Sequence, residues 1–199
     1  MSANRAHPFG CVVLAAGAGT RFGEPKAGAL LREGVRFLDA VCEVAHWTGA
    51  DPIIAVVPPG VVAPPGVRAV VNAIAAGEQV TSLRLGLAQL TNTPVTGALV
   101  WPVDHPFVRV ESVLAVLDAA WRLGAPIVVP AHDGRRGHPV WFARETWREL
   151  MTVHDGGARA VVHSYGARVT EVPVIDAGVL RDVDTKADLD AVRGAPADG

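Results

Sequence analysis

Lysine and cysteine are both scarce in this chain. Of the 18 basic residues, only Lys26 and Lys186 are lysines, which leaves 16 arginines (18 − 2). The two cysteines, Cys11 and Cys42, lie far apart in the sequence, so they indicate neither a disulfide framework nor a zinc site. We therefore expect a reduced intracellular protein.

Segments that would direct the chain to a membrane or to secretion are also missing. No run reaches the roughly 18 uninterrupted apolar residues of a membrane helix, and residues 1–9 lack the apolar core of a signal peptide. We expect a cytoplasmic protein without membrane contact. The net charge of −2 argues against the broad basic surface of a nucleic-acid binder.

Hydrophobic residues make up half of the chain, which is enough for a large core. Apolar runs without polar alternation predict strands that are buried on both faces of a parallel sheet, at residues 12–16, 53–57, 68–71, 98–103 and 127–129. Helical segments are expected between them, at residues 36–47, 82–90 and 110–123. This alternation of strand and helix predicts a doubly wound α/β sandwich.

The pattern changes after Pro130. A polar turn is expected first, then a strand that pairs back, two helices, another strand and a last helix, at residues 133–137, 139–142, 145–151, 158–164, 169–174 and 186–192. Thr185 and Asp188 have the spacing of a capping box for the last helix, with Asp184 as the alternative cap. We see no internal repeat and expect one domain over residues 1–199.

A glycine-rich loop follows the first predicted strand, with the sequence Leu14-Ala15-Ala16-Gly17-Ala18-Gly19-Thr20-Arg21-Phe22-Gly23-Glu24-Pro25-Lys26. Glycines at this place let backbone N–H groups approach phosphate oxygens. The dinucleotide fingerprint is excluded because Phe22 stands where that motif needs glycine, and no Gly-Lys-Ser/Thr makes the loop a P-loop. Arg21 and Lys26 add two cations, which suit a nucleoside triphosphate with about four negative charges.

This loop resembles the signature loop of the MobA-like nucleotidyltransferases. Its Ala15-Ala16-Gly17 variant looks most like the MocA branch, the molybdenum cofactor cytidylyltransferases. The resemblance implies a three-layer α/β/α, Rossmann-like sandwich of the nucleotide-diphospho-sugar transferase type, with a mostly parallel sheet. It implies that Arg21 and Lys26 bind and polarise the triphosphate, and that the loop residues around them hold the nucleotide: Leu14, Ala15, Ala16, Gly17, Gly19 and Thr20.

The resemblance continues through Asn72 and the block from Gly77 to Gly86, which is similar to the family's Gly-x-x-x-Ser-Leu-x-x-Gly block. In the family this block contacts the base and the ribose, so Asn72 and Ser82 are expected at the nucleotide. From the residues alone, Thr81 or Ser82 also fits the N-cap of the following helix.

Asp104 follows the fourth apolar run, and open α/β proteins bind ligands at the carboxyl edge of their sheet. A carboxylate together with phosphate oxygens and water is the usual ligand set of Mg²⁺. The residues Val103-Asp104-His105-Pro106 resemble the family's Gly-Asp-x-Pro motif, with valine for glycine and Trp101 for a small aliphatic residue. The resemblance implies that Asp104 is a metal ligand. Asp184, in a block similar to the family's Asp-x-Asp-Thr-Pro, is the second metal candidate, with a helix cap as its alternative role.

Two later blocks resemble the acceptor-binding part of the family: residues 134–139 are similar to its Gly-x-x-Gly-His-Pro block, and residues 155–160 to its Gly-Asp-x-Gly-Ala-Arg block. Arg136, His138 and Arg159 are therefore expected at the acceptor, and the planar fork of arginine suits phosphate. We place a nucleotide-binding half at residues 9–130 and an acceptor-binding half at residues 131–193. Arg36 stands where the family usually has proline, so we also expect a retuned acceptor pocket.

These observations predict a Mg²⁺-dependent nucleotidyltransferase, in which a phosphate of a small-molecule acceptor attacks an NTP and pyrophosphate leaves. The MocA resemblance favours CTP as the nucleotide and molybdopterin with its molybdenum, the molybdenum cofactor, as the acceptor. The open alternatives are MobA-type guanylyl transfer from GTP, a sugar-phosphate or phospholactate-type acceptor, and a non-catalytic nucleotide-binding module. A monomer is the default, because no exposed heptad or long edge strand indicates assembly.

Overall fold

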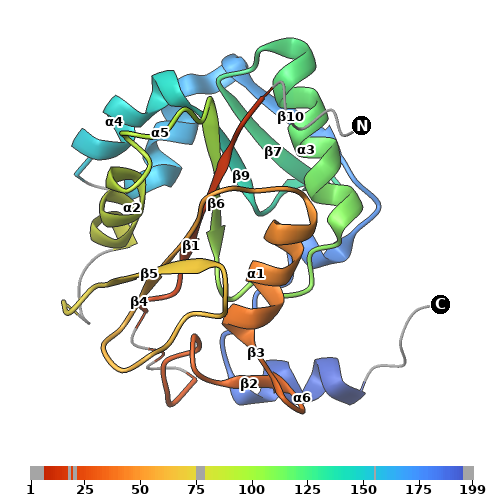
Figure 1. Cartoon of the computed structure of the whole chain (residues 1–199). Coiled ribbons are helices and arrows are strands. Elements are labelled where there is room, and N and C mark those ends of the chain that lie inside the picture. Colours follow the sequence, from red (N-terminus) through yellow and green to blue (C-terminus); the bar gives the residue numbers. More distant parts are fainter. Residues whose placement is uncertain (1–6, 18, 20–21, 75–78, 155, 195–199) are drawn as a thin grey trace.

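The computed structural model describes residues 7–17, 19, 22–74, 79–154 and 156–194. In this part of the chain, eight strands form one sheet in the order β10-β7-β9-β6-β1-β4-β5, with β8 paired to β7 (Figure 1). The strands of this sheet are β1 (Gly10–Leu14), β4 (Ile53–Val57), β5 (Val67–Val71), β6 (Gly97–Pro102), β7 (Ile127–His132), β8 (Arg135–Arg136), β9 (Val140–Ala143) and β10 (Val169–Pro173). A separate hairpin consists of β2 (Leu30–Arg32) and β3 (Val35–Arg36).

Most strand pairs in the sheet are parallel, as the sequence predicts. Strands β6, β1, β4 and β5 run parallel to one another, and β10 runs parallel to β7. The strand expected to pair back is β9, which inserts between β6 and β7 and is antiparallel to both. The polar turn before it carries the short strand β8, which the sequence does not predict.

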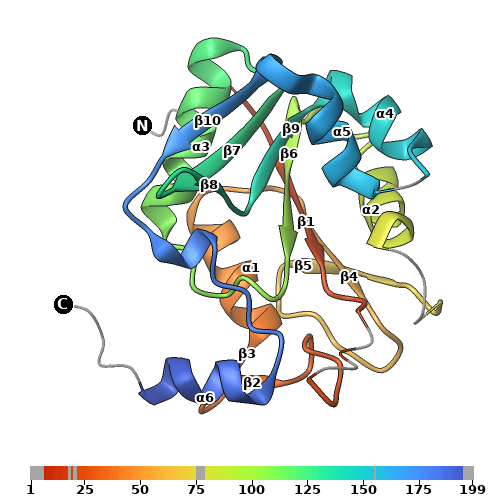
Figure 2. The same ribbon diagram turned by 180° about the vertical axis from the view of Figure 1, so that it is seen from behind.

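Helices cover both faces of the sheet, which gives the predicted three layers (Figures 1 and 2). Helices α1 (Phe37–Trp47) and α3 (Val110–Leu123) lie on one face, and α2 (Gln79–Ala88), α4 (Trp147–Thr152) and α5 (Gly157–Tyr165) lie on the other. Side chains of β1 alternate between the two cores: Cys11 and Val13 pack toward α1 and α3, while Val12 and Leu14 pack toward α2. Helix α6 (Lys186–Gly194) lies beside the hairpin β2–β3 (Figure 2).

Two expectations are corrected by the structure. Strand β5 is not buried on both faces; it is the edge of the sheet, and Val71 is exposed. Helix α2 begins at Gln79, so Thr81 and Ser82 lie inside the helix and neither is its N-cap. The reason is that Val80, which precedes Ser82, is buried under the helix like Leu83, so the apolar face of the helix extends past Ser82 toward its start.

Among the described helices, none combines the length and apolarity needed to cross a lipid bilayer.

The order of the strands creates a point where the chain changes direction across the sheet. From β1 the chain proceeds to β4 and β5 on one side, and it then returns to place β6 on the other side of β1. The carboxyl ends of β1 and β6 flank this switch point, where open α/β sheets bind their ligands. The glycine-rich loop follows β1 and Asp104 follows β6, so the fold brings them to the same edge.

Gly86 sets how closely α2 approaches β1, and its replacement should destabilise the fold. A Cβ atom at Gly86 would lie 2.3 Å from Cγ1 of Val12 and 3.2 Å from Cγ2 of Val56. We expect Gly86→Val to lower the free energy of unfolding by at least about 2 kcal/mol, because overpacking a tight core forces shifts of this cost. Urea unfolding would measure it. The control is Gly28→Val, where the nearest atoms to a Cβ are 3.9 Å away; an equal loss in both variants would contradict the packing argument.

Candidate active site

The loop after β1 forms one wall of a cavity of about 250 Å³ at the switch point. The loop residues Leu14, Ala15, Ala16, Gly17 and Gly19, which are predicted at the nucleotide, line this wall together with Phe22 and Lys26. The amide of Ala15 donates to the carbonyl of Val56 (2.8 Å), and the amide of Val103 donates to the carbonyl of Leu14 (3.1 Å). These two bonds hold the loop between β4 and the turn after β6. Thr20 and Arg21, also predicted here, lie outside the described residues.

Gly19 is needed for the backbone of this loop. Its φ of +61° is a conformation that other residues rarely adopt, and a Cβ there would lie 1.8 Å from the carbonyl oxygen of Glu24. At Gly17, by contrast, a Cβ would meet nothing within 4 Å. Gly17 lines the cavity, so its lack of a side chain leaves room for a ligand rather than for a neighbouring part of the protein.

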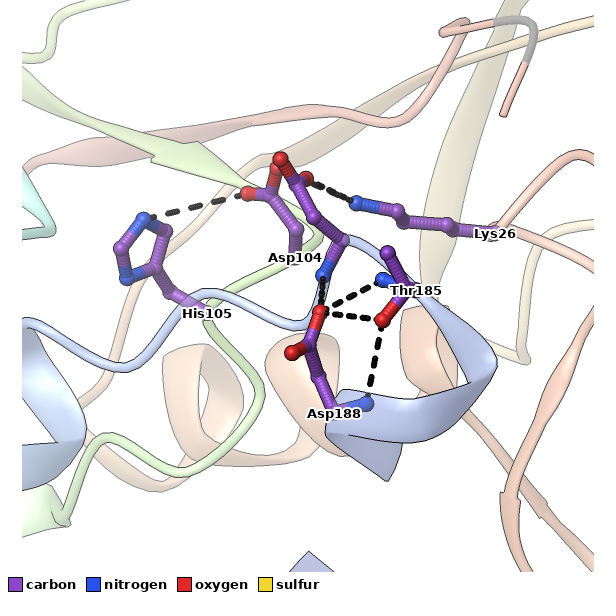
Figure 3. Close-up of polar contacts among 6 residues, drawn as sticks. Lys26, Asp104, His105, Thr185 and Asp188 are labelled. Carbon is purple, nitrogen blue, oxygen red and sulfur yellow. Dashed lines mark hydrogen bonds and ion pairs between the residues drawn. The ribbon is translucent and has the colours of Figure 1, made fainter. Parts of the chain in front are cut away.

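Lys26 lies between two carboxylates that come from distant parts of the chain. Its Nζ is 2.7 Å from Oδ1 of Asp184 and 3.6 Å from Oδ2 of Asp104. The close-up shows Lys26 on one side of Asp104 and His105 on the other (Figure 3). Lys26, Asp104 and Asp184 all line the same cavity as the glycine-rich loop. The structure therefore brings together Lys26, Asp104 and Asp184, which the sequence places 158 residues apart at the extremes.

The carboxylate of Asp184 reaches the cavity because a neighbour caps α6. The hydroxyl of Thr185 accepts from the amide of Asp188 (3.1 Å), and Oδ2 of Asp188 accepts from the amides of Thr185 (2.7 Å) and Asp184 (3.1 Å) (Figure 3). The predicted capping box is thus confirmed at Thr185. The hydroxyl of Thr185 also donates to Oδ2 of Asp188 (2.8 Å), and this bond, followed by those from the backbone amides, lowers the pKa of the Asp188 carboxyl. The capping role for Asp184 itself is wrong, since its side chain faces Lys26.

Asp104 lies in a turn that Trp101 helps to fix. The buried indole Nε1 of Trp101 donates to the carbonyl of His105 (3.1 Å), and the amide of Val183 donates to the carbonyl of Asp104 (2.9 Å). Trp101, which replaces a small aliphatic residue of the family motif, therefore stabilises the turn through this hydrogen bond. Val103, which replaces the family's glycine, lines the cavity beside Asp104.

The two carboxylates fit a divalent cation. Oδ1 of Asp104 is buried and accepts no hydrogen bond within the described part of the chain; Nε2 of His105 is 3.9 Å away from it. Burial lowers the pKa of His105, so that ring is a weak source of compensating charge. Among the described residues, no three His, Cys, Asp or Glu side chains gather as metal ligands. Two carboxylates whose coordination is completed by phosphate oxygens and water match the preference of Mg²⁺.

Of the two residues expected near the base and ribose, Ser82 lies on α2 and Asn72 follows β5. Ser82 lines the cavity, whereas Asn72 is buried behind it and donates from Nδ2 to the hydroxyl of Ser82 (3.0 Å). Asn72 thus lines neither cavity and supports Ser82 instead. Gln79, at the first turn of α2, lines the cavity and was not singled out from the sequence. The available signal was its place within the same block as Ser82.

A second cavity of about 850 Å³ adjoins the first and contains the three residues predicted at the acceptor. Leu14, Gln79 and Pro102 line both cavities, so the two share a wall. Arg136, His138 and Arg159 line the second cavity, together with the glycine-bounded start of α5. The two blocks that resemble the acceptor-binding part of the family therefore meet in space, next to the loop that follows β1.

The three acceptor candidates differ in their charge. The guanidinium of Arg136 is paired with Glu171, with Nη2 2.7 Å from Oε1. Burial, and to a lesser extent the neighbouring His105, lowers the pKa of His138 to about 3, so its imidazole is neutral at pH 7. Arg159 is exposed, and no ion pair to it is found among the described residues. Arg159 is thus the cation in this cavity that is best placed to receive an anionic group.

Arg36 was expected to retune the acceptor pocket, and it lines neither cavity. Its guanidinium binds Asp39 through Nε (2.9 Å) and Nη2 (2.6 Å), and Nη1 donates to the carbonyl of Val62 (2.7 Å). Arg36 precedes the first residue of α1 and ties that helix to the loop after β4. Its role is structural, because the two guanidinium nitrogens that could bind a phosphate side by side are already bound to Asp39.

Comparison with known proteins agrees with this geometry. Residues 11–169 match the model of the MobA-like NTP transferase domain. The chain belongs to this family. It is therefore a nucleotidyltransferase, of a family that binds an NTP and a phosphorylated acceptor. A comparison with curated proteins found no match.

Solved structures share the fold over nearly the whole chain. Rv0371c from Mycobacterium tuberculosis H37Rv is 30% identical with a TM-score of 0.78, and the match covers 96% of this chain and 100% of that one. A structure of the same mycobacterial protein in complex with manganese is 28% identical with a TM-score of 0.76, covering 95% and 99%. A nucleotidyl transferase from Methanothermobacter, 20% identical with a TM-score of 0.77 and coverage of 94% and 96%, shares the fold.

The imidazole of His138, whose Nδ1 is buried, should make stability depend on pH. Its pKa is about 3 in the folded chain and near 6.5 when unfolded, so the unfolded chain binds the extra proton between these values. Stability is then full above pH 6.5 and falls by up to about 1.4 kcal/mol per pH unit as the pH drops. We expect His138→Gln to flatten this slope in urea unfolding between pH 4.5 and 6.5. Exposed His154→Gln is the control, and an equally flattened slope there would contradict the assignment.

Proposed function

We propose that this chain transfers a nucleoside monophosphate from CTP to the phosphate of molybdopterin, with Mg²⁺ held by Asp104 and Asp184. The observation that carries the proposal is the meeting of Lys26, Asp104 and Asp184 in the cavity of the glycine-rich loop, beside a larger cavity with the acceptor candidates. The choice of CTP and of molybdopterin rests on the sequence resemblance at Ala15-Ala16-Gly17.

The chemistry requires positioning and charge stabilisation rather than a covalent enzyme intermediate. An oxygen of the acceptor phosphate attacks the α-phosphorus of the nucleotide in line, the bond to the β-phosphate oxygen breaks, and pyrophosphate leaves with the electron pair. Backbone N–H groups of the glycine-rich loop and the ammonium of Lys26 stabilise the negative charge that develops on the leaving pyrophosphate. Mg²⁺, when bound, neutralises charge on the phosphate oxygens. Arg21 and Thr20 are proposed for the same triphosphate from the sequence alone.

On the acceptor side, we assign binding to Arg159, His138 and Arg136. Arg159 offers a charged fork for an anionic group of the acceptor. His138, neutral at pH 7, can form hydrogen bonds to the acceptor without adding charge. The guanidinium of Arg136 also forms an ion pair with Glu171. Nucleotide-binding and acceptor-binding halves at residues 9–130 and 131–193, a monomeric state and a cytoplasmic location complete the proposal, and all rest on the sequence. The apolar side chains Val80, Leu83, Val129 and Phe142 enclose the body of the acceptor.

Loss of either charge beside the glycine-rich loop should suppress turnover with the fold intact. We expect Lys26→Ala and Asp104→Ala to reduce pyrophosphate release from CTP, with Mg²⁺ and molybdopterin, at least about a hundredfold, as for other groups that stabilise transition-state charge. Thermal unfolding would show that both variants are folded. Lys186→Ala, at the chain's other lysine, is the matched control. Near wild-type release in either site variant would refute its assigned role.

The nucleotide can be identified by ligand-induced stabilisation. With Mg²⁺ present, we expect CTP to raise the melting temperature more than GTP, ATP or UTP, since a ligand at 100 times its Kd adds about 2.7 kcal/mol. Differential scanning fluorimetry of the wild type and Lys26→Ala would measure this, and the variant should lose most of the shift. A preference for GTP would instead favour the guanylyl branch and overturn the choice of CTP.

A further inference from the structure

The position of Lys26 bears on how a metal ion enters the site. Its ammonium lies within 2.7 Å of Asp184 and 3.6 Å of Asp104, the two carboxylates proposed to hold the metal. The lysine side chain is 12% exposed and the two aspartates are 26% and 30% exposed, so solvent screens this cluster only in part. A divalent cation bound to both carboxylates would have to take the place that the ammonium holds, because cations at this separation repel each other strongly.

We propose that Lys26 is an exchangeable internal counter-ion of the metal carboxylates. When a divalent cation binds Asp104 and Asp184, the ammonium leaves them and moves onto the triphosphate in the adjoining glycine-rich loop. This inference rests on the metal placement of the proposed function and adds a coupling that the placement alone does not require. Without nucleotide, metal binding is weak, because the partly buried ammonium of Lys26 is displaced from the two carboxylates and no phosphate is present to take their place. Metal and nucleotide therefore strengthen each other's binding.

The wall of the cavity offers the lysine a short path between its two partners. Lys26 lines the same cavity of about 250 Å³ as Asp104, Asp184, Gly17 and Gly19. At Gly17 a Cβ would meet nothing within 4 Å, so the space beside the loop is open to the phosphates and to the ammonium that follows them. The nucleotide supplies about four negative charges, which compensate both cations.

The choice of lysine over arginine at this position fits an ion that must change partners. Sixteen of the 18 basic residues are arginine, yet lysine stands here. A guanidinium would bind a carboxylate with its rigid fork, as Arg36 binds Asp39 through two nitrogen atoms in this chain. An ammonium is a compact charge on a flexible stem with three donors, and it can pass from carboxylate to phosphate without a matching planar partner.

Binding of Mn²⁺ to the whole chain tests the exchange without reliance on turnover. Electron paramagnetic resonance would measure the Kd of Mn²⁺ for the wild type, Lys26→Met, Lys26→Arg and Lys186→Met, with and without α,β-methylene-CTP. Coupling between two ligands usually amounts to about 5–150-fold. Without nucleotide, we expect Lys26→Met to bind Mn²⁺ at least about tenfold tighter than the wild type, and Lys26→Arg to bind it more weakly. Lys186→Met should match the wild type.

The same measurements in the presence of the nucleotide analogue test the coupling between metal and nucleotide. The analogue should tighten Mn²⁺ binding by the wild type at least about tenfold, and by a clearly smaller factor in Lys26→Met. Equal or weaker Mn²⁺ binding by nucleotide-free Lys26→Met, including none at all, would overturn the exchange. Should Lys26→Met not unfold cooperatively, Lys26→Arg decides: binding of Mn²⁺ as tight as in the wild type overturns the proposal.

Variants of the carboxylates separate this inference from the proposed function. Asp104→Asn and Asp184→Asn should each weaken Mn²⁺ binding in the presence of the nucleotide analogue. If they do and Lys26→Met shows no gain, the metal placement stands and the exchange fails. If neither variant weakens Mn²⁺ binding, the metal placement itself is wrong, and the exchange is overturned with it.

Discussion

The ion pairs of Lys26 with Asp104 and Asp184 join three segments that are distant in the sequence. One segment follows β1, one follows β6, and one precedes α6. Each charge would be costly to leave alone in a partly buried place, so each stabilises the position of the others. This cluster supplies charged side chains to the wall of the cavity beside the glycine-rich loop. Within the described residues, the cluster of Lys26, Asp104 and Asp184 combines charges of both signs, as does a metal–triphosphate complex.

The return of the chain after β10 is what delivers Asp184 to this cluster. Asp176 is buried, and its carboxylate accepts from the amide of Arg109 (2.9 Å), the hydroxyl of Ser112 (2.7 Å) and the amide of Gly178 (2.9 Å). These bonds dock the segment onto the start of α3. The same segment supports the acceptor side, since the amide of His138 donates to the carbonyl of Val179 (2.9 Å). One stretch of irregular backbone thus aligns both cavities.

The apolar pattern predicted most of the fold because a strand buried on both faces leaves a continuous signature. Strands β1, β4 and β6 are buried at every residue, and their runs in the sequence are unbroken. The same signature failed at β5, a run that includes Arg68 and lies at the edge with exposed residues, because edge position depends on which strand lacks a second neighbour. Ser82 shows a related limit. A serine near a helix start suits a cap, but the burial of Val80 extends the helix beyond it.

The sequence by itself determined the class of fold, the family, and the residue types proposed to bind phosphate and metal. Those properties follow from local composition: apolar runs, glycines after a strand, and a carboxylate at the end of another. Only the tertiary structure decided that Lys26 lies between the two aspartates, that Asn72 supports Ser82 from behind, and that Arg36 is bound to Asp39 away from both cavities. Partner choice among charged side chains depends on which segments the sheet order and the returning chain bring within a few ångströms. That proximity is a property of the packed fold and not of any stretch of residues.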